Sequence, residues 1–321
     1  YGAGLLKGWS KEGSRPVFKV VTGVSTGAIS APFAFLGKDY DELIETLYTT
    51  MSTKDVMKMK GPLAALFGDS IASNGPLAKK IACIGTKEFL DKIAEQHKLG
   101  RRLYVGTVNL DAQKFVIWDM GAIACKGDME LFHKVILASA AIPVTFPPTF
   151  FRVEADGQTY DEMHVDGGTL AQVFTTYGLL SHMQKAVKEL GIDPSKVKAK
   201  LYIIRNGYMS SNYVKVKDSL MPIAVRAIDT IIDAQGVGDA YRIYAFMKKR
   251  GNDFNLACIP VDYKPDAKEM FDPCEMTRLF NRGYEDAVGG YKWHKAPPGM
   301  DAFQAAGESP HAAAQEKLND L

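Results

Sequence analysis

The sequence contains few cysteines, and their spacing does not match a metal site or a dense set of disulfides. There are four in 321 residues, with no Cys-x-x-Cys pair and no cluster of histidines beside them. This spacing excludes a zinc site of the usual kind and a disulfide framework. We expect all four to be small buried hydrophobic side chains: Cys83, Cys125, Cys258 and Cys274.

Long hydrophobic runs are also absent. The longest uncharged run, residues 135–151, is shorter than the roughly 20 residues that a spanning helix needs, and it contains three prolines. This excludes a transmembrane span. The sequence begins at Tyr1 without a methionine or a signal peptide, so any targeting segment would precede it. We expect a protein that is soluble or peripheral at a membrane, with its localisation otherwise unassigned.

An excess of charge of one sign is missing too. The net charge is +2, with 39 Lys and Arg scattered among 37 Asp and Glu, so the basic surface of a nucleic-acid-binding protein is not indicated. The composition, 46% hydrophobic and 24% charged, is typical of a globular protein. Without a Ser/Gly/Pro-rich linker, we predict one catalytic domain over residues 1–290. Residues 291–321, rich in Ala, Gly, Pro and charge, are predicted to be a weakly structured tail.

Helical and strand patterns alternate along the chain. Apolar residues at helical spacing or in β-branched and aromatic runs predict the following elements. Helices are expected at 39–50, 87–97, 132–141 and 222–249, and strands at 102–110, 114–120, 199–205 and 254–261, the first two strands forming a hairpin. The pattern predicts an α/β fold with a mostly parallel central sheet flanked by helices.

The most informative motif is Gly23-Val24-Ser25-Thr26-Gly27. It follows a β-rich run (residues 17–22) and precedes a long apolar run (residues 28–36), which is the context of a nucleophile elbow. Gly23 and Gly27 are expected because side chains there would collide with the strand and the helix. The Ser25 hydroxyl would then project into a cleft. The Thr26 backbone N–H, in the first turn of the following helix, would favour a developing oxyanion.

A second motif, Asp166-Gly167-Gly168, follows the strand-like segment 158–160. Asp-Gly-Gly is a common turn by itself. Together with Ser25 it gains another meaning, because a serine hydroxyl needs a base to become nucleophilic at neutral pH. An ionised carboxylate within hydrogen-bond reach can take that role directly.

These residues and several longer stretches resemble the patatin-like phospholipase family, especially its bacterial members, over most of the chain. Beyond the GVSTG and DGG motifs, the similar stretches are residues 1–9, 107–111, 118–121, 138–143 and 146–148. The resemblance implies a three-layer α/β architecture and the hydrolysis of lipid acyl esters. It also implies Ser25 as nucleophile and Asp166 as base, a dyad without histidine, metal or cofactor. A lipid or phospholipid would be the substrate, with transient membrane contact.

One family feature lies outside this sequence. The family places a glycine-rich oxyanion loop immediately before the segment that matches residues 1–9, so the main oxyanion donors are expected to precede Tyr1. The Thr26 N–H remains as a donor. Loss of one such donor typically raises a barrier by about 3 kcal/mol.

Two other interpretations stay open. A Ser–Asp–His esterase would take its histidine from His182 or His294, which follow Asp166 in the chain. His164 shares a strand face with Asp166, and two roles are open for it: tuning of that carboxylate, or a structural histidine with its own hydrogen-bond partners. A non-catalytic lipid-binding scaffold with a degenerate hydrolase fold is the other. For substrate access, residues 57–67 mix apolar side chains with lysines, as in a lid or membrane-contacting loop, or in a helix pair packed on the core.

Overall fold

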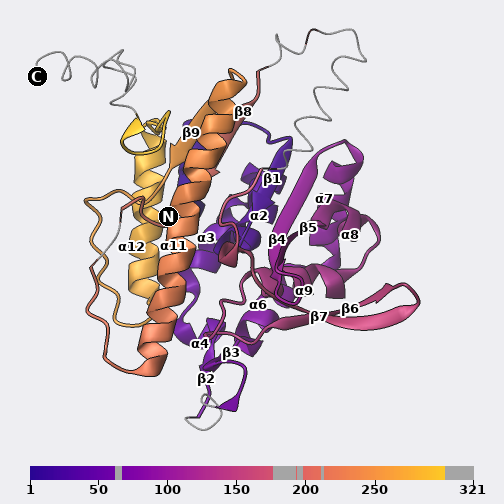
Figure 1. The fold of residues 1–321 in the computed structure, drawn as a ribbon. Coiled ribbons are helices and arrows are strands. Elements are labelled where there is room, and N and C mark those ends of the chain that lie inside the picture. Colours follow the sequence, from indigo (N-terminus) through magenta and orange to yellow (C-terminus); the bar gives the residue numbers. More distant parts are fainter. Residues whose placement is uncertain (62–66, 176–192, 194–197, 211–212, 301–321) are drawn as a thin grey trace, which may run out of the picture.

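The computed structural model describes residues 1–61, 67–175, 193, 198–210 and 213–300, which form helices packed around a small central sheet (Figure 1). The helices are α1 (Gly2–Glu12), α2 (Thr26–Leu36), α3 (Asp41–Thr50), α4 (Thr53–Val56), α6 (Gly75–Ile84), α7 (Lys87–Lys98), α8 (Met120–Cys125), α9 (Met129–Ser139), α11 (Leu220–Lys249) and α12 (Pro273–Val288), with 3-10 turns η1 (Lys38–Tyr40) and η2 (Gly167–Thr169). The strands are β1 (Val20–Gly23), β2 (Lys58–Met59), β3 (Ala72–Ser73), β4 (Arg102–Asn109), β5 (Lys114–Asp119), β6 (Thr149–Ala155), β7 (Gln158–Asp166), β8 (Lys200–Ile204) and β9 (Asp253–Ala257).

The central sheet is mixed in strand direction. Its strands run in the order β1-β4-β7-β6, and β5 also pairs with β4. β1 is parallel to β4, whereas the β4–β5, β4–β7 and β6–β7 pairs are antiparallel. Short turns join β4 to β5 and β6 to β7, and such turns reverse the chain without the crossover that parallel neighbours need. The expected α/β class with flanking helices and the first hairpin are confirmed, but "mostly parallel" is wrong for this sheet.

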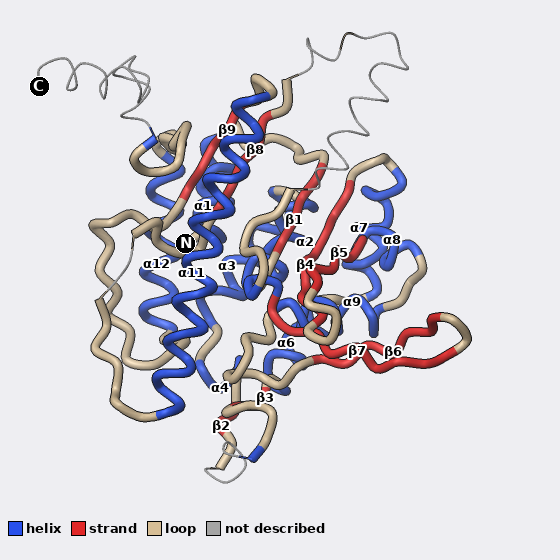
Figure 2. Tube along the Cα trace, viewed as in Figure 1, coloured by secondary structure: helices blue, strands red, loops and turns tan. Residues whose placement is uncertain are grey.

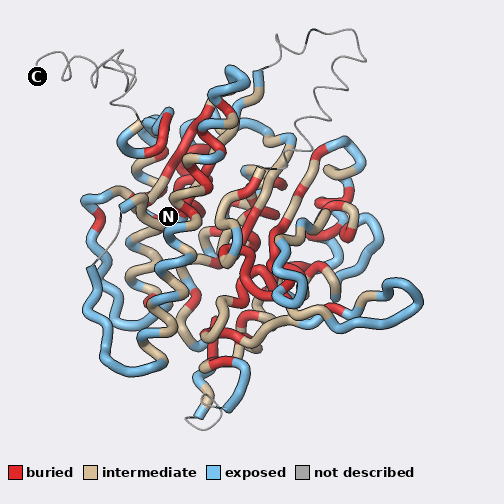
Figure 3. The backbone as a smooth tube through the Cα atoms, in the orientation of Figure 1, coloured by how far each residue is buried: buried red, intermediate tan, exposed pale blue. Residues whose placement is uncertain are grey.

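Helices cover β4, the centre of the sheet. α2, α7, α8 and α9 all contact this strand. Its Leu103 and Val105 are fully buried. Figure 3 shows buried stretches on β4 and, in the C-terminal half, on β9. The catalytic motifs expected from the sequence therefore lie at the edge of the main hydrophobic core, where backbone positions are well fixed by packing.

The C-terminal half adds a second, smaller sheet and two long helices. β8 and β9 form a parallel pair whose connection contains α11, the long helix of Figure 2. Trp9 of α1 lies against Tyr202 of β8 and against Trp293, with ring centroids 4.9 and 4.8 Å away. His294 bridges to Leu256. The first residues beyond 290 thus pack on the domain, and the boundary predicted at that position stays a prediction, with 301–321 outside the described residues.

α1 and α12 touch backbone to backbone. A Cβ atom on Gly4 would overlap the Phe280 carbonyl oxygen, and one on Gly283 would overlap the Tyr1 carbonyl oxygen. Only glycine permits this approach. The first and last described helices therefore pack as one unit, although they are far apart in the sequence.

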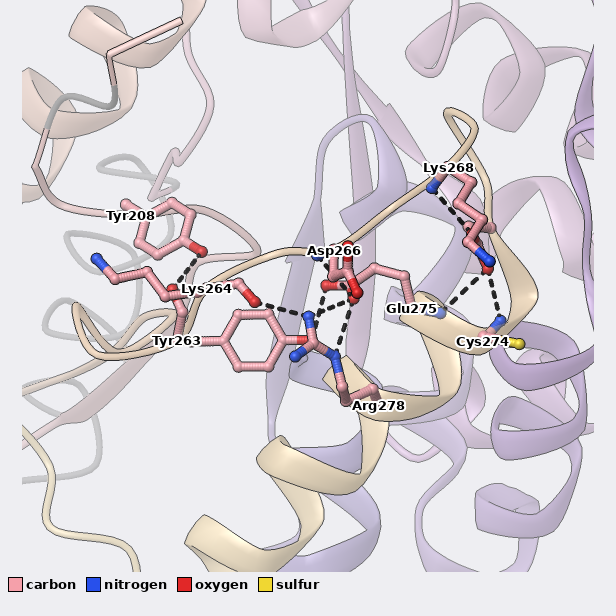
Figure 4. Close-up of polar contacts among 9 residues, drawn as sticks. Tyr208, Tyr263, Lys264, Asp266, Lys268, Cys274, Glu275 and Arg278 are labelled. Atoms are coloured by element: carbon pink, nitrogen blue, oxygen red, sulfur yellow. Dashed lines mark hydrogen bonds and ion pairs between the residues drawn. The ribbon is translucent and has the colours of Figure 1, made fainter.

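A polar cluster fastens the loop after β9 to α12 (Figure 4). The Glu275 carboxylate accepts a 2.8 Å hydrogen bond from the Tyr263 hydroxyl and a 3.2 Å bond from the Asp266 N–H. The Arg278 guanidinium lies over the Tyr263 ring, 4.9 Å from its centroid. Tyr208 donates its hydroxyl to the Tyr263 carbonyl at 3.1 Å. The cluster thus holds the segment that follows β8, which borders the candidate site.

The cysteines differ from expectation. Cys83, Cys125 and Cys274 are exposed and Cys258 is half-buried, so the prediction of buried hydrophobic side chains is wrong. All four are free thiols. Within the part of the chain that the structure describes, none of the helices combines the length and apolar character that crossing a bilayer requires.

Candidate active site

Ser25 occupies a sharp turn between a strand and a helix. β1 ends at Gly23 and α2 begins at Thr26. Ser25 has φ 56° and ψ −128°, a backbone conformation that side-chain-bearing residues rarely adopt. Such strain persists only where the surroundings hold it, and it clusters at functional sites. The elbow geometry predicted from the motif is therefore present.

The two elbow glycines differ in what space requires of them. A Cβ atom at Gly23 would lie 2.7 Å from the Gly27 carbonyl carbon and 2.8 Å from the Ala31 Cβ. These distances are too short for non-bonded carbon atoms. Apart from its chain neighbours and the backbone of its own helix, a Cβ atom at Gly27 would meet no described atom within 4 Å. The expected collision is confirmed for Gly23 and wrong for Gly27.

Ser139, at the end of α9, holds the elbow in place. The Ser25 N–H donates to the Ser139 Oγ at 3.0 Å, and Ser139 donates its hydroxyl to the Gly106 carbonyl at 2.7 Å. Ser139 is fully buried. The nucleophile turn is thereby tied to the centre of β4. Sequence reasoning assigned Ser139 no role, although it is a polar residue within an apolar, alanine-rich run and lies in the family-like stretch 138–143.

Replacing Ser139 by alanine should therefore destabilise the fold. The change leaves the Ser25 N–H and the Gly106 carbonyl without this buried partner, which typically costs about 1–3 kcal/mol per group. The free energy of unfolding from urea titration measures the loss. Ser219→Ala, at an exposed position whose side chain does not cap α11, is the control. An unchanged midpoint in Ser139→Ala would show that water or relaxation replaces the lost bond.

The first turn of α2 is held from the other side by α3. The hydroxyls of Thr26 and Tyr48 lie 3.0 Å apart, and Tyr48 also donates to the Thr26 carbonyl at 3.0 Å. Burial raises the pKa of the Tyr48 phenol, which stays a neutral donor. The next two amides of the turn, Gly27 and Ala28, donate to the Val24 and Ser25 carbonyls. The Thr26 N–H thus belongs to the first residue of a helix that is held by Tyr48 of α3 on one side and, through Ser25, by Ser139 of α9 on the other.

Asp166 stands at the end of β7 with its carboxyl group buried. Its N–H donates to the Ala141 carbonyl at 2.9 Å, and its Oδ1 accepts a 2.7 Å bond from the Gly168 N–H. Its Oδ2 is buried and forms no hydrogen bond of normal geometry with any described residue. Burial raises the pKa of Asp166 to about 7, while the nearby Ser25 hydroxyl and the Gly168 N–H act to lower it. The carboxyl group is therefore poised to change charge near neutral pH.

The two glycines after Asp166 differ in their contacts. A Cβ atom at Gly167 would lie 2.6 Å from the Gly106 carbonyl oxygen and 2.9 Å from Val24 Cγ1, so this position needs glycine for its close approach to β4 and the elbow. Gly168 supplies the N–H that orients the carboxylate. The Gly106 carbonyl oxygen thus lies against Gly167 and accepts from Ser139, which in turn accepts from the Ser25 N–H of the elbow.

Ser25 and Asp166 open into one cavity of about 380 Å³. This volume lies in the range of sites for small ligands. Its walls come from the elbow, the segment after Asp166, the end of β8 and α11. The lining residues that the arguments below use are Ser25, Asp166, Arg205, Arg226, Asp229 and Asp233. The structure therefore brings the two predicted residues together, and it adds charged groups from the C-terminal half that sequence reasoning did not single out.

The histidines considered for a triad lie elsewhere where the structure describes them. His164 is fully buried, with its Nδ1 2.9 Å from Thr107 Oγ1 and its Nε2 3.4 Å from Glu162. Burial lowers the pKa of His164. His294 is joined to β9 through its backbone. Among the described residues neither is hydrogen-bonded to Ser25 or Asp166, so His164 matches the structural alternative, and His182 lies outside the described residues.

Within the described ranges, no group of three or more His, Cys, Asp or Glu side chains is placed to hold a metal ion.

Comparison with known families agrees with the geometry. No curated protein gives a significant match to the chain. The family model for patatin-like phospholipases matches residues 1–178, a segment that includes both Ser25 and Asp166. The chain thus belongs to the patatin-like phospholipase family, which indicates a hydrolase acting on lipid esters.

Proposed function

We propose that the chain hydrolyses lipid acyl esters with Ser25 as nucleophile and Asp166 as general base. The observation that carries this proposal is the pairing of a strained serine with a buried carboxyl oxygen, Asp166 Oδ2, that has no other hydrogen-bond partner among the described residues. Both groups line the same cavity. An acceptor of this kind, next to a hydroxyl, is what proton abstraction from a serine requires.

The reaction proceeds in two halves. Asp166 Oδ2 takes the Ser25 proton while Oγ bonds to the ester carbonyl carbon, and the carbonyl oxygen becomes an oxyanion beside the Thr26 N–H. Collapse breaks the bond to the alcohol or lysolipid, which leaves with the proton from Asp166. Water then gives a proton to the same carboxylate and attacks the acyl-enzyme, and collapse releases the fatty acid and returns the proton to Ser25.

Contact with a lipid surface is part of the proposal. The arm that contains β2 and β3 exposes Met59 and Phe67 to solvent. Their exposed fractions are 61% and 82%. Lys60 beside them pairs with Asp69 at 2.7 Å. Exposed apolar side chains next to lysine suit shallow insertion into a lipid interface. This segment includes part of the predicted access loop, and residues 62–66 lie outside the described residues.

A serine-directed phosphonate tests the nucleophile. The protein should be labelled once, and peptide mass spectrometry should place the label on Ser25. Ser25→Ala should lose both the label and the hydrolysis of a short-chain aryl ester. Absence of both labelling and ester turnover would argue for the lipid-binding scaffold, and labelling at another serine would refute the assignment of Ser25.

The pH dependence of turnover should report Asp166. Since burial raises its pKa to about 7 and only the ionised form accepts a proton, kcat/KM should rise with pH and level off above about pH 7. Below about pH 6 the rise should approach tenfold per unit. Initial rates on a neutral aryl ester between about pH 5 and about pH 9 give the profile. A midpoint near that of an ordinary exposed carboxyl group would contradict the role assigned to the buried one.

A further inference from the structure

α11 supplies a charged wall to the cavity from outside the segment that matches the family. Arg226, Asp229, Ile232 and Asp233 follow one another at helical spacing, so they share one face of α11, and all four line the cavity that contains Ser25. The dyad comes from residues 1–178, whereas this wall comes from the C-terminal half. The wall is therefore a feature of this chain's own cavity and is not given by the family motifs.

Contacts with the segment after Asp166 fix the position of α11 relative to the dyad. Ile232 Cγ2 lies 3.3 Å from the position of a Cβ atom on Gly168. Gln235 donates to the Leu170 carbonyl at 2.6 Å, and Asp239 accepts from the Gln172 N–H at 2.8 Å. The middle of α11 is thus packed along the segment that follows Asp166. Asp229 and Arg226, nearer the start of the helix, extend beyond this packed zone along the cavity.

One ion pair on the wall is formed within the protein. Arg205, whose side chain is almost fully buried, pairs with Asp233 Oδ1 at 3.1 Å and donates to the Asp233 carbonyl at 3.2 Å. Burial and the Asp233 carboxylate raise the pKa of Asp229, and Arg226 lowers it. Arg205 already pairs with Asp233, so the wall presents one further residue of each sign to the cavity, Arg226 and Asp229, and a ligand that carries both charges would complement them.

We propose that Arg226 and Asp229 form a subsite for a zwitterionic headgroup, with a phosphate on Arg226 and an ammonium group on Asp229. This inference rests on the proposed function, because the substrate ester must reach Ser25 from the same cavity. The buried, unbonded Oδ2 of Asp166 in that cavity marks its reacting end. A headgroup with both charges meets both wall residues. A neutral headgroup meets neither, and an anionic one lacks the group that Asp229 would bind.

Three short-chain substrates that differ only in headgroup test the subsite: dihexanoyl phosphatidylethanolamine, dihexanoyl phosphatidylglycerol and dihexanoyl glycerol. In Asp229→Asn, the ratio of kcat/KM for the ethanolamine ester to that for the phosphatidylglycerol ester should fall about tenfold. In Arg226→Gln, both phosphate esters should lose about tenfold relative to dihexanoyl glycerol. Asp218→Asn, an exposed residue that does not line the cavity, is the matched control and should keep the wild-type ratios.

The outcomes separate the two proposals. Turnover of the three esters with ratios that stay at the wild-type values in both variants would overturn the subsite and leave the hydrolase intact. Absence of turnover of every ester by the wild-type chain, together with absence of phosphonate labelling at Ser25, would overturn the proposed function itself.

Discussion

Asp166→Asn should remove ester hydrolysis and at the same time stabilise the folded chain at alkaline pH. Loss of a positioned general base typically lowers turnover by roughly 10² to 10⁴-fold, and we expect the upper part of this range because the same carboxylate serves both halves of the reaction. Asparagine keeps an oxygen that can accept the Gly168 N–H at the position of Oδ1. The orientation of the side chain is therefore preserved while its basicity is lost.

The stability gain follows from the raised pKa of Asp166. The folded carboxyl group has a pKa of about 7, above the value of about 3.9 in an unfolded chain, so the folded state holds the proton more tightly. The stability that this group contributes is complete below about pH 4 and is lost as pH rises to about 7. Asparagine carries no charge at any pH and avoids this loss. The advantage of Asp166→Asn should therefore grow by roughly 2–3 kcal/mol between pH 5 and pH 8.

Urea unfolding of wild type and variant at both pH values measures this change. Asp218→Asn makes the same chemical substitution at an exposed position and controls for the loss of one negative charge. A pH-independent difference for Asp166→Asn would show that the carboxyl group is ionised in the folded chain throughout. Loss of turnover in Asp166→Asn, combined with an equal loss on replacing a histidine such as His182, would favour the Ser–Asp–His alternative.

The parts of the site that could be predicted from the sequence are those encoded by neighbouring residues. The strained Ser25 turn requires a strand, small residues and a helix in succession, and all of these are local. Asp166 followed by two glycines is local as well. Their meeting in one cavity was inferred from chemistry and from the family resemblance, because neither motif alone specifies a partner.

The features that escaped prediction depend on contacts between distant segments. Ser139 bonds the elbow across more than a hundred residues, and its signal is one polar residue in an apolar run. The charged wall belongs to a segment that was predicted only as a helix over residues 222–249, since periodicity does not say which cavity a charged residue faces. The sheet direction depends on pairing between β4 and β7, which no local pattern encodes. Cysteine counts likewise say nothing of exposure.

Gly23→Ala should disrupt the elbow, whereas Gly27→Ala should not. An added methyl group at Gly23 would lie 2.8 Å from the Ala31 Cβ and 2.7 Å from the Gly27 carbonyl carbon, which belongs to the helix backbone and cannot rotate away. Overpacking of this kind costs typically about 1–3 kcal/mol and shifts the backbone. Here the backbone that shifts is the strained turn at Ser25, with φ 56°, so loss of phosphonate labelling should accompany the loss of stability.

Gly27→Ala is the matched comparison, since it adds the same methyl group four residues away. Apart from the chain neighbours and the backbone of the same helix, no described atom lies within 4 Å of that methyl group. Alanine is also a better helix former than glycine by about 1 kcal/mol. The melting temperature of Gly27→Ala should therefore equal or exceed that of wild type, while that of Gly23→Ala should fall by several degrees. Equal melting temperatures in the two variants would mean that the contact between β1 and α2 can relax, and the glycine at position 23 would then lose its steric explanation.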